Sequence, residues 1–176
     1  MTSQPLDAAL VHPHHPDYAA ILAWPFPAEP FYVGQVLGVL RDDIPQRVLH
    51  GTCYIYLYRD KAGNAVGFGT FDLDRTYASF TGGLLHGYIP VLGVRPDQNG
   101  RGYGRQIVDP LVSEAVLFHR SPHPMSDLLF LDVYGTNAPA IGLYEKCGFQ
   151  KLNPTNPIPD PQNGNEPYFV MARKLA

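Results

Sequence analysis

The hydrophobic and polar positions predict a β-hairpin in the first half of the chain. From Thr52 to Arg59 the residues are mostly β-branched or aromatic, and the same composition returns from Ala65 to Leu73. Between the two runs lies Asp60-Lys61-Ala62-Gly63-Asn64, whose aspartate, glycine and asparagine are typical of a turn. Two strand-like runs joined by a short segment of this kind indicate a pair of antiparallel strands.

The next apolar segments predict a strand followed by a helix. The residues from Leu85 to Val94 have a strand composition that ends at Arg95-Pro96-Asp97. The segment from Gly102 to Arg120 has helical spacing instead, with one apolar face formed by Ile107, Leu111, Ala115 and Phe118. Pro110 lies inside this pattern and predicts a kink or a late start of the regular helix, because proline has no N–H to donate.

Three short segments with clear limits follow. Leu128 to Tyr134 is a short apolar run that predicts a strand, and Asn137 to Lys146 predicts a helix that Gly148 ends. Tyr168 to Lys174 predicts a last strand. The segment before it, from Asn153 to Pro167, is rich in proline and asparagine, so we expect a loop there.

The first 50 residues carry a weaker pattern. Tyr18 to Trp24 predicts a short helix, which the prolines that follow would end. For Phe31 to Leu40, glycines and β-branched residues leave helix and strand open. Taken together, the elements predict one domain over residues 1–176 of the mixed α/β (α+β) class.

Composition and charge narrow the class of protein. The chain has 176 residues, is 45% hydrophobic and carries a formal net charge of -3, which suits a globular domain despite 18 prolines and 17 glycines. The mild acidity argues against a nucleic-acid partner, and two cysteines cannot form a disulfide framework. The chain shows no basic leader with an apolar run and no apolar run of about 20 residues, so we expect a cytoplasmic protein without a membrane partner.

A cluster of histidines near the N-terminus raises the question of a metal site. His12, His14 and His15 alternate with prolines, so they share no helical face. Asp17 is the one carboxylate near them, and no cysteine lies close in the sequence. Because metal sites need several ligands on a shared face, we expect a solvated loop and no metal.

The most informative segment is a glycine-rich turn between the strand ending at Val94 and the helix that follows. Glycines let a backbone approach an anion closely, and the free N–H groups of a helix's first turn point toward it. Arg101 and Arg105 add positive charge there. Two known phosphate motifs do not fit: Gly104-Arg105-Gln106 lacks the Lys-Ser/Thr of a Walker loop, and Ile107 stands where a dinucleotide fingerprint has its third glycine.

Another family does fit. Asn99-Gly100-Arg101-Gly102-Tyr103-Gly104 resembles the acetyl-CoA pyrophosphate loop of GCN5-related N-acetyltransferases (GNATs), Gln/Arg-x-x-Gly-x-Gly/Ala, with Asn99 replacing the first residue. The segment Asn137 to Phe149 is similar to the family's Asn-x-x-Ala-x-x-x-Tyr-x-x-x-Gly-Phe. The resemblance extends from Tyr54 to the C-terminus. It implies a GNAT-like single domain with a central mixed, mostly antiparallel sheet, splayed after the fourth strand and flanked by helices.

The resemblance also implies where acetyl-CoA binds. The end of the fourth strand would bond to the pantetheine arm, with the Val94 N–H polarising the thioester carbonyl, and the glycine-rich turn would hold the pyrophosphate. Asn137 would contact the arm as well. The implied acetyl-CoA-binding residues are Leu92, Gly93, Val94, Asn99, Gly100, Arg101, Gly102, Tyr103, Gly104, Arg105, Asn137 and Tyr144.

The implied chemistry needs an acid and a base. Tyr144 occupies the position of the family's usual general acid, and a phenol is a reasonable proton donor to a thiolate. Some members carry a glutamate six residues before the position of Val94, where this chain has Tyr88. His86 lies on the same strand face, and Asp72 and Asp74 on the preceding strand are further candidates, alone or through water. A remaining alternative is that the chain has no dedicated base and that water removes the proton.

The resemblance implies an acetyl-CoA-dependent N-acetyltransferase that acts by direct transfer on a primary amine of a small molecule or peptide. The acceptor would lie between residues 24–32 and 153–168. Dimers are frequent in the family, and the chain permits a homodimer. Two rivals stay open: a non-catalytic acyl-CoA-binding module of the same fold, and a nucleotide-binding protein using the same glycine-rich turn.

Overall fold

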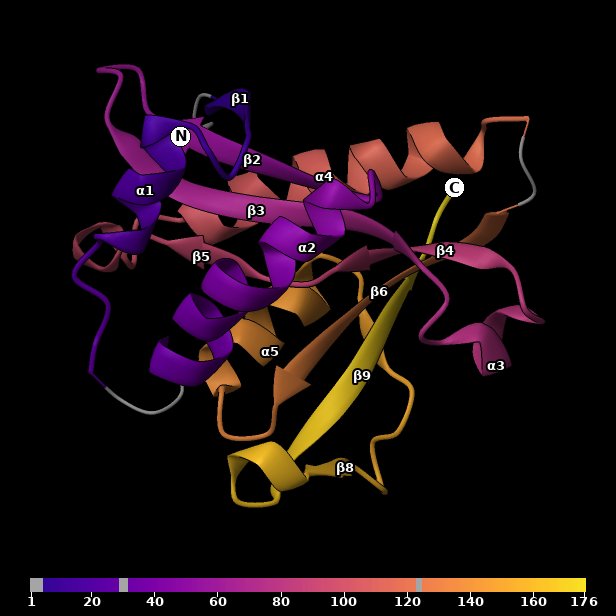
Figure 1. Cartoon of the computed structure of the whole chain (residues 1–176). Helices are drawn as coiled ribbons and strands as arrows, with labels where there is room; N and C mark the ends of the chain where they lie inside the picture. Colours follow the sequence, from indigo (N-terminus) through magenta and orange to yellow (C-terminus); the bar gives the residue numbers. More distant parts are fainter. Residues whose placement is uncertain (1–4, 29–31, 123–124) are drawn as a thin grey trace. The chain divides into compact units, whose positions relative to one another are not determined.

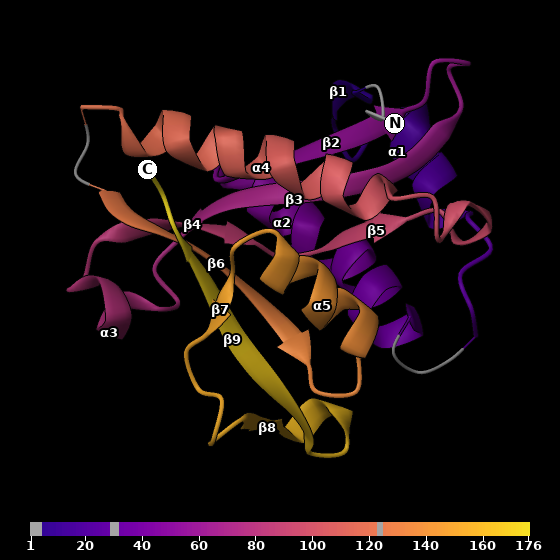
Figure 2. The same cartoon turned by 180° about the vertical axis from the view of Figure 1, so that it is seen from behind.

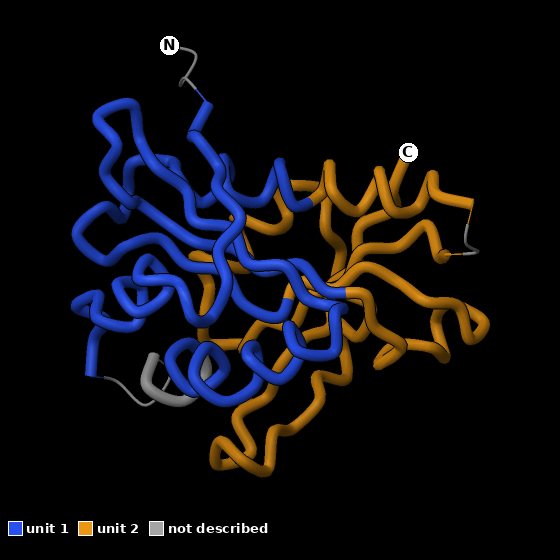
Figure 3. The backbone as a smooth tube through the Cα atoms, turned by 45° about the horizontal axis from the view of Figure 1, so that its top comes forward, with its two compact units in different colours: residues 1–72, 90–111 blue, residues 73–89, 112–176 orange. Residues whose placement is uncertain are grey.

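The computed structural model describes residues 5–28, 32–122 and 125–176. The chain divides into two compact units, one of residues 1–72 and 90–111 and the other of residues 73–89 and 112–176 (Figure 3). Both contain strands and helices, and most strand pairs are antiparallel, which confirms the mixed α/β class. The expectation of one domain over residues 1–176 stays a prediction. None of the helices in the described ranges is both long and apolar enough to cross a membrane.

The first unit contains four strands in antiparallel pairs, β1 (Asp7–Val11), β2 (Cys53–Arg59), β3 (Ala65–Asp74) and β5 (Leu92–Val94) (Figure 1). The predicted hairpin is confirmed as β2 and β3. In its turn, Asp60 Oδ1 accepts hydrogen bonds from the N–H groups of Ala62 and Asn64, each at 2.9 Å. The short side chain of aspartate therefore closes the turn by bonding to its own backbone.

The N-terminal part of the first unit contains the helical segments α1, η1 and α2. Helix α1 (Pro16–Leu22) confirms the predicted short helix, while α2 (Ile44–Leu49) has no counterpart in the prediction. Between them, η1 (Tyr32–Asp43) is a π-helix, so the open choice for residues 31–40 is settled in favour of helix; residue 31 lies outside the described residues. The helices bury their apolar side chains with those of the strands in one core, which includes Ile21, Leu40, Ile44, Ile55, Leu57 and Phe68.

Helix α4 (Tyr103–His119) packs closely on β3 in its first half. A Cβ atom at Gly67 would lie 2.3 Å from Ile107 Cδ1, and one at Gly69 would lie 2.9 Å from Leu111 Cδ1. The two glycines therefore let helix and strand approach more closely than larger residues would allow. The helix begins at Tyr103 and includes Pro110, so the alternative of a late start is wrong.

The predicted strand from Leu85 to Val94 is wrong as one element, because it is two strands, β4 (Leu85–Ile89) and β5, interrupted at residues 90 and 91. Pro90 cannot donate to a strand ladder. At the interruption, Thr70 Oγ1 accepts a hydrogen bond from the Val91 N–H (3.0 Å) and donates one to the Val91 carbonyl (2.7 Å). The Val91 carbonyl also accepts the Thr70 N–H at 3.0 Å, so the buried Thr70 hydroxyl replaces a backbone partner for the Val91 N–H alone.

In the second unit, β4 pairs in parallel with β6 (Met125–Tyr134), and β6 pairs antiparallel with β9 (Glu166–Lys174). Two short strands, β7 (Gln150–Lys151) and β8 (Ile158–Asp160), also pair with β9. The expected loop from Asn153 to Pro167 therefore contains a strand, and the 3₁₀ turn η3 (Pro161–Asn163) follows it.

Helices α3 (Ala78–Thr81) and α5 (Ala138–Lys146) lie wholly in this unit, which also contains the second half of α4. Helix α5 confirms the prediction, and Gly148 follows its end with a φ of 85°, a value that favours glycine. Phe130, Val170 and Tyr77 are among the residues of this unit's buried cluster. Cys147 in this unit and Cys53 in the first unit are both buried, and neither forms a disulfide.

Candidate active site

One edge of strand β5 presents backbone N–H groups that no other described strand pairs. Within the described ranges its pairing is with β3, where Val94 lies opposite Gly67 and Leu92 opposite Gly69. The Arg95 N–H bonds to the Val66 carbonyl at 2.8 Å, so the N–H of Arg95 points to β3. Since successive N–H groups of a strand point to opposite sides, those of Leu92 and Val94 point away from β3. All three residues of β5 are only half-buried.

The chain then passes through the glycine-rich turn into α4 (Figure 2). A 3₁₀ turn, η2 (Pro96–Gln98), follows β5, and Arg95 and Asp97 form an ion pair across it (2.6 Å). Gly100 and Gly102 have φ angles of 77° and 78°, in the left-handed region that favours glycine, and a Cβ atom at either would meet no atom within 4 Å. The turn is therefore open around both glycines and leads directly to the N-terminus of a helix.

The residues of this turn fit a pyrophosphate. The first N–H groups of a 17-residue helix have no partner within the helix and favour anions. Arg101 is exposed, and Arg105 is exposed with a loose ion pair to Asp109, at 3.6 Å between Nε and Oδ2. The first unit thus brings together the strand edge of Leu92 and Val94 and the loop from Asn99 to Arg105, all predicted as acetyl-CoA-binding residues.

Asn137 and Tyr144, also predicted to bind acetyl-CoA, lie on α5 in the second unit. Asn137 is the N-cap of α5, and its Oδ1 accepts the Ala140 N–H at 3.2 Å. Such a cap uses the amide oxygen and leaves the amide NH₂ as a donor. Tyr144 is buried on the same helix, with its ring edge-on to Phe149 (centroids 6.0 Å apart). Burial raises the pKa of the Tyr144 phenol, so the hydroxyl keeps its proton at neutral pH.

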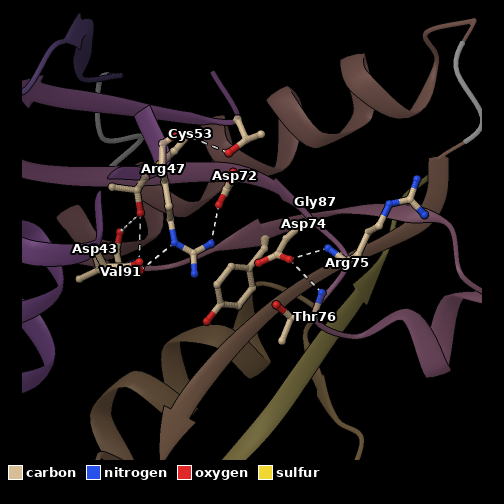
Figure 4. Close-up of polar contacts among 12 residues, drawn as sticks. Asp43, Arg47, Cys53, Asp72, Asp74, Arg75, Thr76, Gly87 and Val91 are labelled. Atoms are coloured by element: carbon tan, nitrogen blue, oxygen red, sulfur yellow. Dashed lines mark hydrogen bonds and ion pairs between the residues drawn. The ribbon is translucent and has the colours of Figure 1, made fainter. Parts of the chain in front are cut away.

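Two carboxylates considered as bases are engaged in local structure (Figure 4). Asp72 is buried and accepts a hydrogen bond from Arg47 Nη1 at 2.5 Å, while Arg47 Nε bonds to Asp43 at 2.7 Å. Asp74 closes the turn after β3: its Oδ1 accepts from the N–H groups of residues 75 and 76, the second at 2.9 Å. An ion pair to arginine and a turn closure both favour structural roles for these carboxylates.

His86 is fully buried, and its two ring nitrogens have backbone neighbours. Nε2 accepts the Tyr77 N–H at 3.1 Å, so this nitrogen carries no proton. Nδ1 lies 3.2 Å from the Gly87 carbonyl oxygen and therefore carries the proton that it donates there. This neutral, doubly engaged ring positions Tyr77 and favours a structural role for His86.

Tyr88 is half-buried on β4, and its phenol contacts Asp132, which the sequence analysis did not identify as a site residue. The Tyr88 hydroxyl donates to Asp132 Oδ2 at 3.0 Å, and the Tyr77 hydroxyl donates to Asp132 Oδ1. Burial raises the pKa of the Asp132 carboxyl, although the two tyrosine hydrogen bonds lower it. The signal for Asp132 was present in the sequence as a single charged residue inside the apolar run from Leu128 to Tyr134.

Side-chain contacts hold parts of the two segments expected to border the acceptor. Trp24 packs against Phe68 in the first unit's core, with ring centroids 6.0 Å apart; residues 29–31 of this segment lie outside the described residues. In the second unit the Tyr134 hydroxyl donates to Asp160 and the Thr136 hydroxyl to Glu166. These contacts tie the β8 region to the end of β6.

The N-terminal histidines have local roles. His15 is the N-cap of α1, and its Nδ1 accepts the Asp17 N–H at 3.2 Å. The rings of His12 and His14 stack at 5.3 Å. No group of three or more potential ligands suited to a metal ion occurs among the described residues.

A family model matches most of the chain, and a curated relative matches part of it. A model of the acetyltransferase (GNAT) family matches residues 14–149. Mycothiol acetyltransferase from Saccharomonospora viridis is 33% identical over 97 residues, which are 55% of this chain and 30% of that protein. The chain therefore matches less than a third of this curated relative's length.

Solved structures with the same fold match nearly the whole length of the chain. Spermidine N-acetyltransferase from Vibrio cholerae, in complex with CoA and spermine, has a TM-score of 0.66 at 14% identity, over 98% of this chain and 96% of that one. The NatC complex bound to a Gag peptide and CoA has a TM-score of 0.66 at 20% identity, over 98% of this chain and 100% of that one. At such low identity the likeness establishes the fold alone.

Proposed function

The chain belongs to the GNAT family of acetyltransferases, and on this premise we propose that it transfers the acetyl group of acetyl-CoA directly to a primary amine of a small molecule or peptide. The observation that carries the proposal is the outer edge of β5. There the N–H groups of Leu92 and Val94 point away from β3, a few residues before the open turn of Gly100 and Gly102 and the N-terminus of α4.

Each part of the first unit has a task in this function. The Leu92 N–H would bond to the pantetheine arm, and the Val94 N–H would polarise the thioester carbonyl. A backbone donor held in a strand stabilises the negative charge that develops on that oxygen without having to reorient. The helix N-terminus, with Arg101 and Arg105, would hold the pyrophosphate.

On α5, Tyr144 would give its proton to the departing sulfur, and Asn137 would bind the arm through its amide NH₂. The burial that raises the pKa of Tyr144 keeps this proton in place before the reaction. A thiolate is a strong enough base to take it as the C–S bond breaks.

The class of acceptor rests on the chemistry of related proteins. The Vibrio cholerae structure contains spermine and the NatC structure a peptide, and both contain CoA. Spermine and peptides carry amines, which supports an amine acceptor for this chain. The cytoplasmic location and the homodimer stay predictions.

A screen of amines tests the proposal. Purified protein is mixed with acetyl-CoA and single amines (polyamines, amino acids, short peptides), and thiol release is followed above the rate without amine. Release that depends on one class of amine supports the proposal, with the acetylated amine confirmed by mass spectrometry. Binding of acetyl-CoA without release from any amine would favour the non-catalytic module. Stronger thermal stabilisation by ATP or NAD than by acetyl-CoA would favour a nucleotide-binding protein.

A further inference from the structure

The proposed reaction needs a group that removes a proton from the acceptor amine, because alkyl amines are ammonium ions at neutral pH. Three candidate bases from the sequence already bind other groups of the protein. Asp72 pairs with Arg47, Asp74 accepts hydrogen bonds in the turn after β3, and His86 contacts two backbone groups. A fourth titratable group, Asp132, has a different environment.

Asp132 lies on β6, and Tyr88 lies on the neighbouring strand β4. The parallel register places Tyr88 opposite Phe130, so the side chains of Tyr88, Phe130 and Asp132 share one face of the second unit's sheet. The carboxylate is held by two phenols, Tyr77 at Oδ1 and Tyr88 at Oδ2. Each carboxylate oxygen has two lone pairs, so each can accept one more hydrogen bond.

The supporting residues fix Tyr77 from three sides. His86 accepts its backbone N–H at 3.1 Å, Phe130 stacks on its ring with centroids 5.1 Å apart, and its hydroxyl bonds to Asp132. Tyr88 lies edge-on to the same ring at 6.1 Å. Asp132 is therefore oriented by a rigid aromatic group and not by a flexible side chain.

Within the part of the chain that the structure describes, Asp132 forms no ion pair with a cation. Among the ion pairs of the described ranges, none joins Asp132 to a lysine or arginine. Besides burial, the groups that influence the pKa of Asp132 are Tyr77, Tyr88 and Asp74. The pKa of Tyr168 is raised first by burial and then by the charge of Asp132. Aromatic rings and an unbalanced carboxylate are a favourable setting for an ammonium group.

From this geometry we propose that Asp132 is the general base that takes the proton of the acceptor ammonium, a role that rests on the proposed function. The ammonium nitrogen gives one proton to a carboxylate oxygen of Asp132, and its freed lone pair forms a C–N bond with the acetyl carbonyl carbon. The C–S bond breaks, and its electron pair stays on the sulfur. Tyr144 gives its proton to that sulfur and regains one from the nitrogen, and Asp132 releases its own proton to solvent.

Burial raises the pKa of Asp132, which supports this role because a base works best when its pKa lies closer to the working pH. The rate then falls on the acid side as Asp132 becomes protonated, and this fall lies above the ordinary aspartate pKa of about 3.9. Removing the hydrogen bond from Tyr88, which lowers this pKa, should move the fall to higher pH.

The experiment compares Asp132→Asn with the wild type from pH 6 to pH 8, using an acceptor amine that the wild type acetylates and whose pKa is near 10. Asparagine keeps the shape and an acceptor oxygen but cannot take a proton. We expect kcat/KM to fall about 100- to 10,000-fold at pH 7 with unchanged acetyl-CoA binding. Because the variant must use free amine, its deficit should shrink by about tenfold per pH unit as the free fraction rises.

Two further variants make the result specific. Asp127→Asn changes a carboxylate on the same strand whose partner is Lys174 (3.5 Å), and it should leave kcat/KM unchanged. Tyr88→Phe should shift the acid-side fall to higher pH. The role of Asp132, but not the proposed function, would be overturned by either of two results. One is a kcat/KM deficit of Asp132→Asn that is the same at every pH, and the other is an acid-side fall that does not shift in Tyr88→Phe. Absence of amine-dependent thiol release by the wild type would overturn the proposed function and this role together.

Discussion

Replacing Thr70 by valine tests whether one hydroxyl group holds the interruption between β4 and β5. Valine has nearly the shape of threonine but neither donates nor accepts a hydrogen bond. The Val91 carbonyl would keep the hydrogen bond from the Thr70 N–H (3.0 Å), but the Val91 N–H would lose its acceptor. Both residues are buried, so water would not readily replace the lost partner.

The size of the effect follows from these two bonds. A buried donor left without a partner costs about 1–3 kcal/mol, and the lost bond to the carbonyl costs about 0.5–1.5 kcal/mol. We therefore expect Thr70→Val to lower the free energy of unfolding by about 2–4 kcal/mol. Thr70→Ser is the matched control, because it keeps the hydroxyl and loses a single methyl group at a cost of about 1 kcal/mol.

The assay is urea unfolding of the three proteins, with equal slopes required so that the midpoints report stability. Because β5 carries the donors for acetyl-CoA, the valine variant should also have a higher KM for acetyl-CoA than the serine variant. A valine variant as stable as the serine variant would refute the reasoning, since the hydroxyl would then not hold the interruption.

Three other variants test separate parts of the account. Gly67→Ala should lower the free energy of unfolding by about 1–3 kcal/mol, because its Cβ would lie 2.3 Å from Ile107 Cδ1. Ile107→Val removes that Cδ1 atom, so in urea unfolding the double variant should lose less stability than the two single variants added together. Simple additivity would contradict this. In steady-state assays, Gly102→Ala should raise the KM for acetyl-CoA more than it lowers kcat. Space is free around this position, but alanine is strained at a φ of 78°. An unchanged KM would contradict this expectation. Tyr144→Phe should lower kcat with acetyl-CoA binding retained, as titration of CoA would show, and unchanged turnover would rule out Tyr144 as the acid.

Local patterns were sufficient for the hairpin, the glycine-rich turn and the two principal helices. In each case the decisive residues are neighbours in the sequence, such as Asp60 with Asn64. Strand β1 could not be found in this way: four of its five residues are exposed, and it is a strand because it pairs with β2. Helix α2 has six residues, too few for a clear period. Pro90 did carry a signal for the interrupted strand, because proline cannot donate within a ladder.

In the candidate site, too, the sequence predicted the contiguous part and missed the part that the fold assembles. The turn from Asn99 to Arg105 is contiguous, so its motif is visible in the sequence. The environment of Asp132 is not, because its partners Tyr77 and Tyr88 are 55 and 44 residues away. The sequence also could not show that His86 is occupied, since its partners are backbone groups whose position depends on the fold.

The central claim is that acetyl-CoA binds along the outer edge of β5 and on the turn that follows. A titration of acetyl-CoA into isotope-labelled protein, read from backbone amide NMR signals, tests it most directly. The N–H signals of Leu92 and Val94 and those of residues 101–105 should shift most. The Gly93 N–H, which points toward β3, should shift less. Equal shifts along β5, or the largest shifts outside these residues, would contradict the account.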